Sequence, residues 1–183
     1  MTAEPTTDAE RLALVRERIR DVPDFPKPGI LFRDITPVLA DPVAMSAALT
    51  LHLAALEGLG RIDRVVGIES RGFLFGMAIA ERVGAGFVPV RKPGKLPAAT
   101  RSVRYDLEYG SDELHIHADA IEPGHNVVIV DDLLATGGTA GATRQLVETL
   151  GGTVSLALFL IELTALQGRS KLPDVRTHAI VAY

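Results

Sequence analysis

The sequence predicts an α/β fold with an open, mostly parallel β-sheet flanked by helices. Short apolar segments alternate with helical patterns from residue 64 to residue 163, which is typical of strands covered by helices on both faces. The length of 183 residues fits one domain with a substantial core. Polar loops follow the first three apolar segments, and ligands of parallel sheets bind at such strand ends. We therefore expect the ligand site in one crevice at the carboxyl edge of the sheet.

The composition is that of an ordinary globular protein, with 47% hydrophobic and 23% charged residues. A net charge of -4 and a pI near 5.7 disfavour nonspecific binding to nucleic acid or to an anionic membrane. The absence of cysteine excludes disulfides and thiolate metal sites. No apolar segment approaches the roughly 20 residues of a membrane helix, and the charged N-terminus predicts no secretory signal. We therefore expect a cytoplasmic protein that binds neither nucleic acid nor membrane.

The N-terminal part of the chain predicts two helices joined by a proline-rich loop. Thr7 and Glu10 have the spacing of a capping box, which opens the first helix. The apolar residues expected on the inner face of this helix are Leu12, Val15, Ile19 and Val22. Residues 24–38 contain three prolines and are expected to form an ordered loop. Asp41 and Pro42 have the residue types of an N-cap and a first helical position, so they open the second helix.

Four buried strands are expected in the rest of the chain. They are residues 64–68, 86–92, 126–132 and 153–163. One helix is expected to begin near Ser70, which can serve as its N-cap, and another is expected to follow Thr139. Residues 100–121 are polar, alternate in character and contain a turn centred on residues 109–112. They therefore predict an antiparallel excursion from the main sheet.

A phosphate site is predicted where the third strand gives way to a helix. The five residues at this point are Ala135, Thr136, Gly137, Gly138 and Thr139. A helix N-terminus offers free N–H groups and a partial positive charge to an anion. The glycines allow the backbone to close around a phosphate, and the threonines add hydroxyl donors. The pattern is neither a Walker A loop nor a dinucleotide-binding turn, so it favours a monophosphate.

Two aspartates, Asp131 and Asp132, stand directly before this turn and should repel a phosphate. Like charges about 4 Å apart, at an effective dielectric near 20, cost roughly 4 kcal/mol, so direct contact is unfavourable. A sugar diol removes the conflict, because its hydroxyl groups donate hydrogen bonds to carboxylates. The implied ligand is a ribose 5-phosphate, with its phosphate in the turn and its 2′,3′-diol on the two aspartates.

Several motifs of the chain resemble those of the type I phosphoribosyltransferase family. The segment VVIVDDLLATGGT is similar to the phosphoribosyl pyrophosphate motif of that family. The segments FPKPGILFRDI, SRGFLFG, RKPGKLP and YDLEYG resemble those of the family members that act on adenine. The likeness runs in order from about Asp24 to Leu163. It implies one phosphoribosyltransferase domain over residues 1–183, with a small hood at about residues 22–40 and a flexible antiparallel loop at about residues 95–118.

The resemblance implies a pentosyltransferase of purine salvage, which converts adenine and phosphoribosyl pyrophosphate into AMP and pyrophosphate. The displacement at C1′ would pass through an oxocarbenium-like transition state. Mg²⁺ is the implied cofactor, held by the substrate, with Asp131 and Asp132 contacting it through water rather than directly. A homodimer is also implied. Two alternatives stay open: a phosphoribosyltransferase for another purine, and a non-catalytic regulator that senses phosphoribosyl pyrophosphate.

The resemblance also assigns roles at the reacting centre. The basic residues expected to bind pyrophosphate are Arg71, Arg91, Lys92 and Lys95. For the two lysines, a solvated basic patch is the alternative. Glu108 is the candidate general acid–base that exchanges a proton with adenine, although a lone glutamate in a loop is usually only exposed. Tyr109 would help the loop close and exclude water.

Adenine recognition is expected from residues 30–34 of the implied hood. The backbone near Leu31 can accept from the 6-amino group and donate to a ring nitrogen, and Phe32 can supply an apolar face. Arg33 is expected either to contact the base or to order the hood. The alternative for Phe32 is an ordinary core residue. An acceptor opposite the 6-amino group would reject 6-oxopurines.

Overall fold

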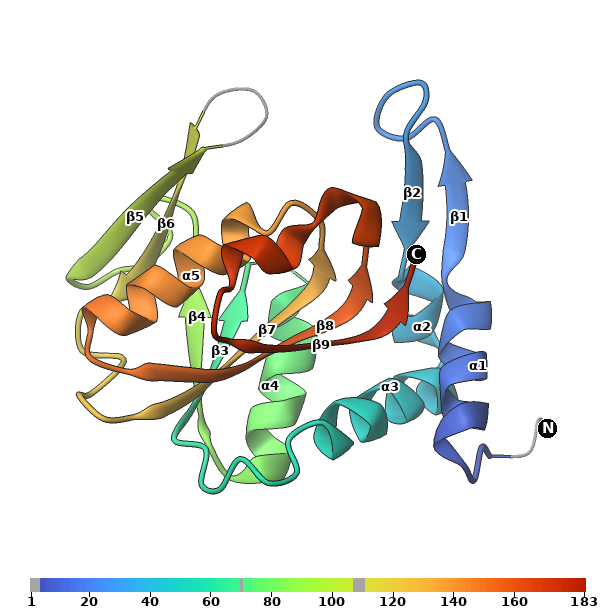
Figure 1. The fold of residues 1–183 in the computed structure, drawn as a ribbon, viewed down its shortest axis with the longest axis horizontal. Helices are drawn as coiled ribbons and strands as arrows, with labels where there is room; N and C mark the ends of the chain where they lie inside the picture. Colours follow the sequence, from blue (N-terminus) through green and yellow to red (C-terminus); the bar gives the residue numbers. More distant parts are fainter. Residues whose placement is uncertain (1–3, 70, 107–110) are drawn as a thin grey trace. The chain divides into compact units, whose positions relative to one another are not determined.

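The structure is a computed structural model that describes residues 4–69, 71–106 and 111–183. The chain divides into two compact units, Met1–Ala55 and Leu56–Tyr183, each of which is described by itself. Figure 1 shows the elements of both units along the chain. The expectation of one domain, with its hood and loop boundaries, stays a prediction. No helix in the described ranges has both the length and the apolar character needed to cross a bilayer.

The first unit combines helices with a β-hairpin. Its elements are α1 (Asp8–Arg18), β1 (Arg20–Pro23), β2 (Leu31–Asp34), α2 (Thr36–Ala40) and α3 (Pro42–Ala54). The capping box is confirmed, because the Thr7 hydroxyl accepts from the Glu10 N–H while the Glu10 carboxylate accepts from the Thr7 N–H. The second cap is also confirmed: the Asp41 carboxylate accepts from the first N–H groups of α3, and Pro42 is its first residue.

Two expectations for the first unit are wrong. Val22 does not lie on the first helix, because α1 ends at Arg18 and Val22 pairs with Phe32 in the antiparallel hairpin β1–β2. Residues 24–38 are not entirely loop, because they include β2 and the first residues of α2. Their prolines are compatible with these elements, since they fall between the two strands or in the first turn of α2, where the helix needs no N–H donor.

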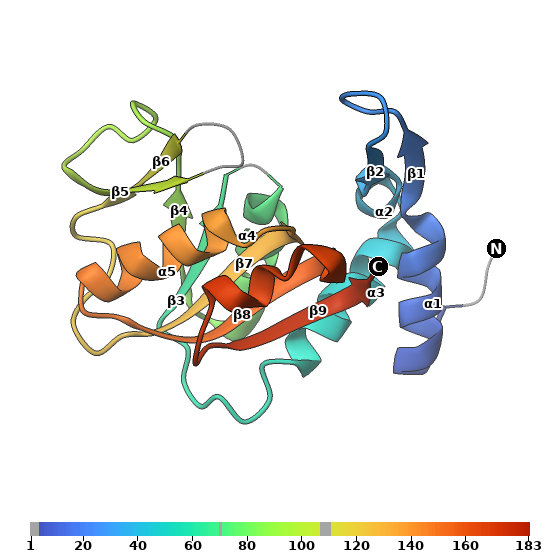
Figure 2. The ribbon, with the colours of Figure 1, turned by 45° about the horizontal axis from the view of Figure 1, so that its top comes forward.

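The second unit is an α/β layer structure, as predicted. In the described part of the chain, five parallel strands have the order β4-β3-β7-β8-β9. These strands are β3 (Arg64–Ile68), β4 (Gly86–Val90), β7 (Asn126–Leu134), β8 (Thr153–Glu162) and β9 (Arg176–Ala182). The helices α4 (Gly72–Val83) and α5 (Gly138–Thr149) lie on opposite faces of this sheet (Figures 1 and 2). The strand β9 is an addition that the apolar pattern does not predict.

The antiparallel excursion is confirmed as a hairpin of β5 (Thr100–Asp106) and β6 (Ser111–His117). Its register pairs residue 106 with residue 111, so the strand β6 already includes Asp112. The expectation of a turn at residues 109–112 is therefore wrong for residues 111 and 112, while residues 109 and 110 lie outside the described residues. The hairpin contacts α5, and a bridge between Arg91 and His115 ties it to the end of β4.

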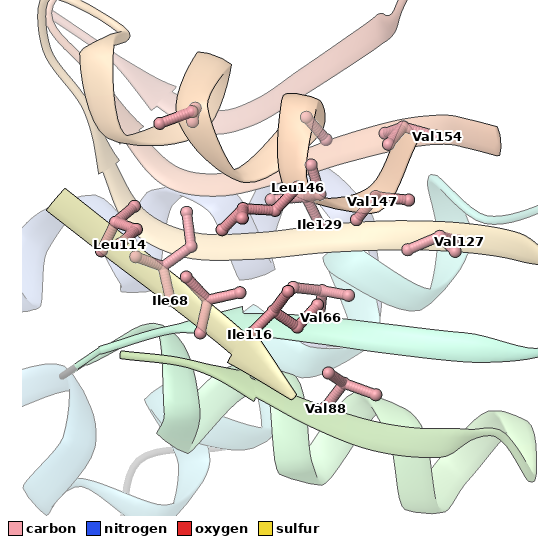
Figure 3. Close-up of a cluster of buried hydrophobic side chains, with 14 of the residues drawn as sticks. Val66, Ile68, Val88, Leu114, Ile116, Val127, Ile129, Leu146, Val147 and Val154 are labelled. Carbon is pink, nitrogen blue, oxygen red and sulfur yellow. The ribbon is translucent and has the colours of Figure 1, made fainter. Parts of the chain in front are cut away.

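The core of the second unit lies between the sheet, α5 and the hairpin (Figure 3). Its buried side chains include Val66, Ile68, Val88, Leu114, Ile116, Val127, Ile129, Leu146, Val147 and Val154. The strands are almost purely apolar because both faces of a parallel sheet are covered. This packing makes the carboxyl edge of the sheet a rigid platform for the loops that follow β3, β4 and β7.

Candidate functional site

A cavity of about 240 Å³ lies at the carboxyl edge of the sheet in the second unit. Glu69 and Arg71 reach it from the loop after β3, Lys92 from the loop after β4, and residues 131–140 from the end of β7 and the start of α5. Leu114 of the hairpin lines it as well. The three polar loops that the sequence predicts to converge therefore do so.

The chain reverses from β7 into α5 within residues 135–137. Gly137 is the N-cap of α5 and has φ +80°, a left-handed conformation that side chains other than glycine rarely adopt. A Cβ atom at Gly137 would also lie only 2.2 Å from the carbonyl oxygen of Gly168. Glycine is thus required at this position for two reasons: its backbone conformation and the close contact.

The N-terminus of α5 presents backbone N–H groups in an arrangement that can bind an anion. The helical hydrogen bonds of α5 begin with the N–H of Gly141, which donates to the carbonyl oxygen of Gly137 at 2.8 Å. The N–H groups of Gly138, Thr139 and Ala140 therefore have no acceptor within the helix. The first turn, all of it within the described residues, carries no acidic side chain. These N–H groups and the positive end of the helix dipole therefore favour a phosphate at this turn.

The two aspartates lie within β7 and not in a loop after it. The strand continues to Leu134, so the expected strand end after Asp132 is wrong. Asp132 is only 7% exposed and its carboxylate accepts a hydrogen bond from Arg71 Nε at 2.8 Å. Asp131 Oδ1 accepts from the N–H of Asp132, also at 2.8 Å. Both aspartates line the cavity, although neighbouring residues of a strand alternate between its faces.

Asp131 is the aspartate of the pair whose charged form is disfavoured by its surroundings. Its side chain packs against the start of α4, where a Cβ atom at Gly72 would lie 3.0 Å from Asp131 Oδ1. Burial raises the pKa of Asp131 well above its ordinary value, and the neighbouring carboxylate of Asp132 raises it further. The hydrogen bond from the N–H of Asp132 and the guanidinium of Arg71 offset only part of this effect. A ligand that donates hydrogen bonds to these carboxylates would therefore relieve an unfavourable arrangement.

Lys92 is held by the hairpin. Its ammonium group forms an ion pair with Asp112 of β6 and donates to the hydroxyl of Tyr105 of β5 at 3.1 Å. Burial lowers the pKa of Lys92, but the hydrogen bonds to Asp112 and Tyr105 more than offset this, and the pKa is raised. The same contact with Lys92 lowers the pKa of Asp112. Lys92 is thus a charged group at the cavity whose counter-ion is supplied by the protein.

Glu69 connects the loops that follow β3 and β4. Its two carboxylate oxygens accept from Arg91 Nη2 at 2.9 Å and from the N–H of Lys92 at 2.8 Å. Arg91 also donates to the carbonyl oxygen of Lys95. In the described part of the chain, neither Arg91 nor the exposed Lys95 lines the cavity. Of the four basic residues predicted to bind pyrophosphate, the structure brings Arg71 and Lys92 to the cavity.

The residues expected to recognise adenine belong to the first unit, on β2. Leu31 is 47% exposed, and the ring of Phe32 packs edge-on against Phe25 with 5.1 Å between centroids. Arg33 forms an ion pair with Asp21 across the hairpin. Phe32 is therefore half-buried on a small hairpin rather than enclosed in a core.

Some site residues lie outside the described residues, and others are found only in the structure. Ser70, Glu108 and Tyr109 belong to the first group. The roles of Asp112 and Gly168 belong to the second, because an ion pair across a hairpin and a contact between distant glycines depend on register and tertiary packing. The alternation of residues 111–117 gives a signal for a strand but not for its partner in space. Among the described residues, no group of three or more His, Asp or Glu side chains is placed to hold a metal ion.

Residues 31–181 match the phosphoribosyl transferase domain family. The adenine phosphoribosyltransferase of Synechococcus sp. (strain JA-3-3Ab) is 57% identical over 168 residues, which are 91% of this chain and 96% of that protein. That of Caldanaerobacter subterraneus subsp. tengcongensis is 59% identical over 158 residues, 86% of this chain and 91% of its own length.

Solved structures give the same likeness. The adenine phosphoribosyltransferase from Thermoanaerobacter pseudethanolicus has a TM-score of 0.91 and 53% identity, covering 94% of this chain and 99% of that one. The enzyme from Saccharomyces cerevisiae, in complex with adenine and D-2,5-dideoxy-2,5-imino-altritol 1,6-bisphosphate, has a TM-score of 0.89 and 43% identity, with coverage of 94% and 99%.

We predict that Asp131→Asn stabilises the ligand-free protein at neutral pH. The folded state raises the pKa of Asp131 above the ordinary value of 3.8, so the folding stability it contributes is lost as pH rises through the folded pKa. Asparagine keeps the acceptor for the Asp132 N–H and cannot ionise. Urea denaturation across pH should show the variant's advantage growing as pH rises from about 4. The exposed Asp119→Asn serves as control, and a wild-type protein that is more stable than Asp131→Asn at neutral pH would contradict the raised pKa of Asp131.

Proposed function

The chain belongs to the adenine phosphoribosyltransferases of the type I phosphoribosyltransferase family, and we propose that the cavity of its second unit binds the phosphoribosyl group. The protein is a pentosyltransferase of purine salvage, which joins adenine to C1′ of phosphoribosyl pyrophosphate and yields AMP and pyrophosphate. One observation carries the assignment of the cavity. The acid-free N-terminus of α5 and the pair Asp131 and Asp132 line the same small space.

The 5′-phosphate is assigned to residues 135–139 and the ribose diol to the two aspartates. The free N–H groups of Gly138 and Thr139 can donate to phosphate oxygens, and the threonine hydroxyls of the turn add further donors. A neutral sugar separates the phosphate from Asp131 and Asp132, which otherwise repel it. The diol hydroxyls donate to carboxylates that are already partly removed from water, where such hydrogen bonds are strongest.

Substrate binding exchanges the partners of the charged groups. In the free protein, Asp132 is neutralised by Arg71 and Lys92 by Asp112. When the diol donates to Asp132, the guanidinium of Arg71 becomes available to the diphosphate. Lys92 lines the same cavity and can turn from Asp112 to the same anion. These groups then stabilise the negative charge that develops on the leaving pyrophosphate.

Arg91 and Lys95 complete the proposed pyrophosphate site, although neither lines the cavity in the described part of the chain. Both belong to the loop that carries Lys92, and Arg91 is held near it by Glu69. The role of these two residues rests on the resemblance of the segment RKPGKLP to the corresponding family motif.

Mg²⁺ is part of the proposal, and the residues of the cavity fit it. Carboxylate oxygens are the ligands that Mg²⁺ prefers, and Asp131 and Asp132 supply them at the place assigned to the ribose. No group of three or more His, Asp or Glu side chains in the described ranges would hold the ion without substrate. We assign the ion to the diphosphate, with the aspartates reaching it through water. When bound, it would neutralise charge on the departing diphosphate.

The residues of the chain position the reactants, exchange a proton with adenine and exclude water. The α5 turn and the aspartates fix the ribose so that C1′ is presented to adenine in a reactive geometry. Glu108 is assigned the exchange of the N9 proton of adenine, and Tyr109 is assigned the exclusion of water from C1′. Both lie outside the described residues, so their roles rest on the resemblance of the segment YDLEYG.

Recognition of adenine is assigned to Leu31, Phe32 and Arg33. The rings of Phe25 and Phe32 meet edge-to-face with an interplanar angle of 74°, and the face of Phe32 is assigned to the base. Leu31 is 47% exposed, and its backbone groups are assigned the hydrogen bonds to adenine. Arg33, paired with Asp21, orders the hairpin that carries them. A backbone acceptor for the 6-amino group would face the oxygen of a 6-oxopurine and reject it.

A homodimer in the cytoplasm completes the proposal. Leu74 and Met77 are exposed large apolar side chains one turn apart on α4, and such surfaces favour association with a second copy. The absence of cysteine agrees with a reducing compartment.

We predict that the double variant Asp131→Asn/Asp132→Asn lowers kcat/KM for phosphoribosyl pyrophosphate by about 100-fold or more, because the diol loses both anionic acceptors. In the same assay, Glu108→Ala should lower kcat, because the proton exchange with adenine is lost. AMP formation is measured with Mg²⁺, adenine and phosphoribosyl pyrophosphate, with the exposed Asp119→Asn as the matched control. Wild-type rates in the double variant would refute the diol assignment. A wild-type protein that binds phosphoribosyl pyrophosphate without forming AMP would instead favour a non-catalytic sensor.

We predict a preference for adenine over hypoxanthine of about 10⁴-fold in kcat/KM. Phe32→Ala should raise KM for adenine and leave KM for phosphoribosyl pyrophosphate unchanged, because it removes an apolar face and no phosphate contact. Competition between the two purines in one assay gives the ratio directly. Equal turnover of hypoxanthine would show that the chain serves another purine.

A further inference from the structure

The phosphate turn, residues 135–139, packs against a second segment of the chain that has no role in the proposed mechanism. This segment is the 3₁₀ helix η2 (Gly168–Lys171), which follows β8 and the short turn η1 (Thr164–Leu166). A Cβ atom at Gly137 would lie 2.2 Å from the carbonyl oxygen of Gly168, and a Cβ atom at Gly168 would lie 2.3 Å from the carbonyl oxygen of Ala135. The backbones of the turn and of η2 are therefore in direct contact at the two glycines. Neither position has room for a side chain.

The contact continues along the first turns of α5. A Cβ atom at Gly141 would lie 3.1 Å from the carbonyl oxygen of Lys171. One turn further, Arg144 Nη1 donates to the carbonyl oxygen of Pro173 at 2.6 Å. The segment from residue 168 to residue 173 thus forms a backbone wall beside the helix that carries the free N–H groups.

An ion pair anchors this wall to the sheet. Arg169 forms a two-pronged contact with Glu162 at the end of β8, with Nε to Oε1 at 2.8 Å and Nη2 to Oε2 at 2.6 Å. Its remaining nitrogen, Nη1, donates to the carbonyl oxygen of Thr177 on β9 at 2.8 Å. Glu162 is only 5% exposed, and Leu172, which belongs to the wall, is buried in the core. A planar guanidinium held by three hydrogen bonds fixes orientation as well as position.

From these contacts we propose that Glu162, Gly168 and Arg169 form a brace that holds the phosphate turn in its binding shape. They are positioning residues, since in the described part of the chain none of them lines the cavity. The inference deepens the proposed function and rests on the assignment of the 5′-phosphate to residues 135–139. It names the residues that make a glycine-rich turn rigid.

The physical reason is that the turn has little stiffness of its own. Gly137 and Gly138 are adjacent, and glycine restricts the backbone least of all residues. A set of N–H donors binds an anion well only when all of them are held near the correct geometry, within about 0.5 Å. The backbone of the wall is in close contact with Gly137 and Ala135, so the turn cannot move toward it. Ordering is thus supplied by the fold before the phosphate arrives.

The first variant is Gly168→Ala. The φ of Gly168 is not in the left-handed region, so alanine adds no left-handed strain. Its methyl group would meet the carbonyl oxygen of Ala135 at 2.3 Å and the side chain of Leu134 at 2.9 Å, so the strand end that leads into the turn must shift. We expect the Kd for AMP to rise about 10- to 100-fold, the loss that a displaced binding group causes. The Kd for adenosine, which lacks the phosphate, should stay unchanged. Gly86→Ala is the matched control, because the nearest atoms that its methyl group would meet belong to the side chain of Arg64.

The second variant, Glu162→Gln/Arg169→Met, removes the ion pair without leaving a buried charge unpaired. The same loss of AMP affinity with unchanged adenosine affinity is expected, together with a raised KM for phosphoribosyl pyrophosphate and an unchanged KM for adenine. Arg169→Lys should recover only part of the loss, because lysine keeps the charge but not the fork. Arg176→Ala, an exposed arginine on β9, is the control.

Isothermal titration of each protein with AMP and with adenosine separates the outcomes. Brace variants that keep the wild-type ratio of the two affinities overturn the inference and leave the proposed phosphate site intact. Variants that lose both affinities equally also overturn it, since that is the result of a general structural role. A wild-type protein that binds adenosine as tightly as AMP overturns the phosphate site itself, and the brace with it.

Discussion

The chain has to reverse direction within residues 135–137 to pass from β7 into α5, and the other features of the site depend on this constraint. So short a reversal requires a left-handed glycine at Gly137, and it leaves the first N–H groups of α5 free beside the end of the strand. It also places the carboxylates of Asp131 and Asp132 in the cavity that those N–H groups line. A donor surface for phosphate and an acceptor surface for a diol thereby share one cavity.

The cost of this arrangement is electrostatic, and the ligand-free protein meets it with its own side chains. Asp132 is paired with Arg71, and Lys92 with Asp112, while the pKa of the half-buried Asp131 is raised. A charged group that is satisfied within the protein costs less to bury than one left alone. The same pairs define what the substrate must offer: hydroxyl donors for the acids and an anion for the cations. Phosphoribosyl pyrophosphate carries both.

The sequence predicted the sheet and the ligand turn because both leave local patterns. Strands covered on two faces are apolar throughout, as in residues 127–130, and a glycine–threonine turn before a helix is visible without a structure. The edge strand β9 was missed because its apolar and polar residues follow no clear alternation. The ion pair of Asp132 with Arg71, and the contact of Gly137 with Gly168, depend on burial and long-range packing. Such contacts have no signature in neighbouring residues.

The most direct measurement is a crystal structure of the protein with AMP bound. We expect hydroxyl oxygens of the ribose at about 3 Å from the carboxylates of Asp131 and Asp132. Phosphate oxygens are expected at a similar distance from the N–H groups of Gly138 and Thr139. A pentose bound elsewhere, with the phosphate away from the N-terminus of α5, would contradict it.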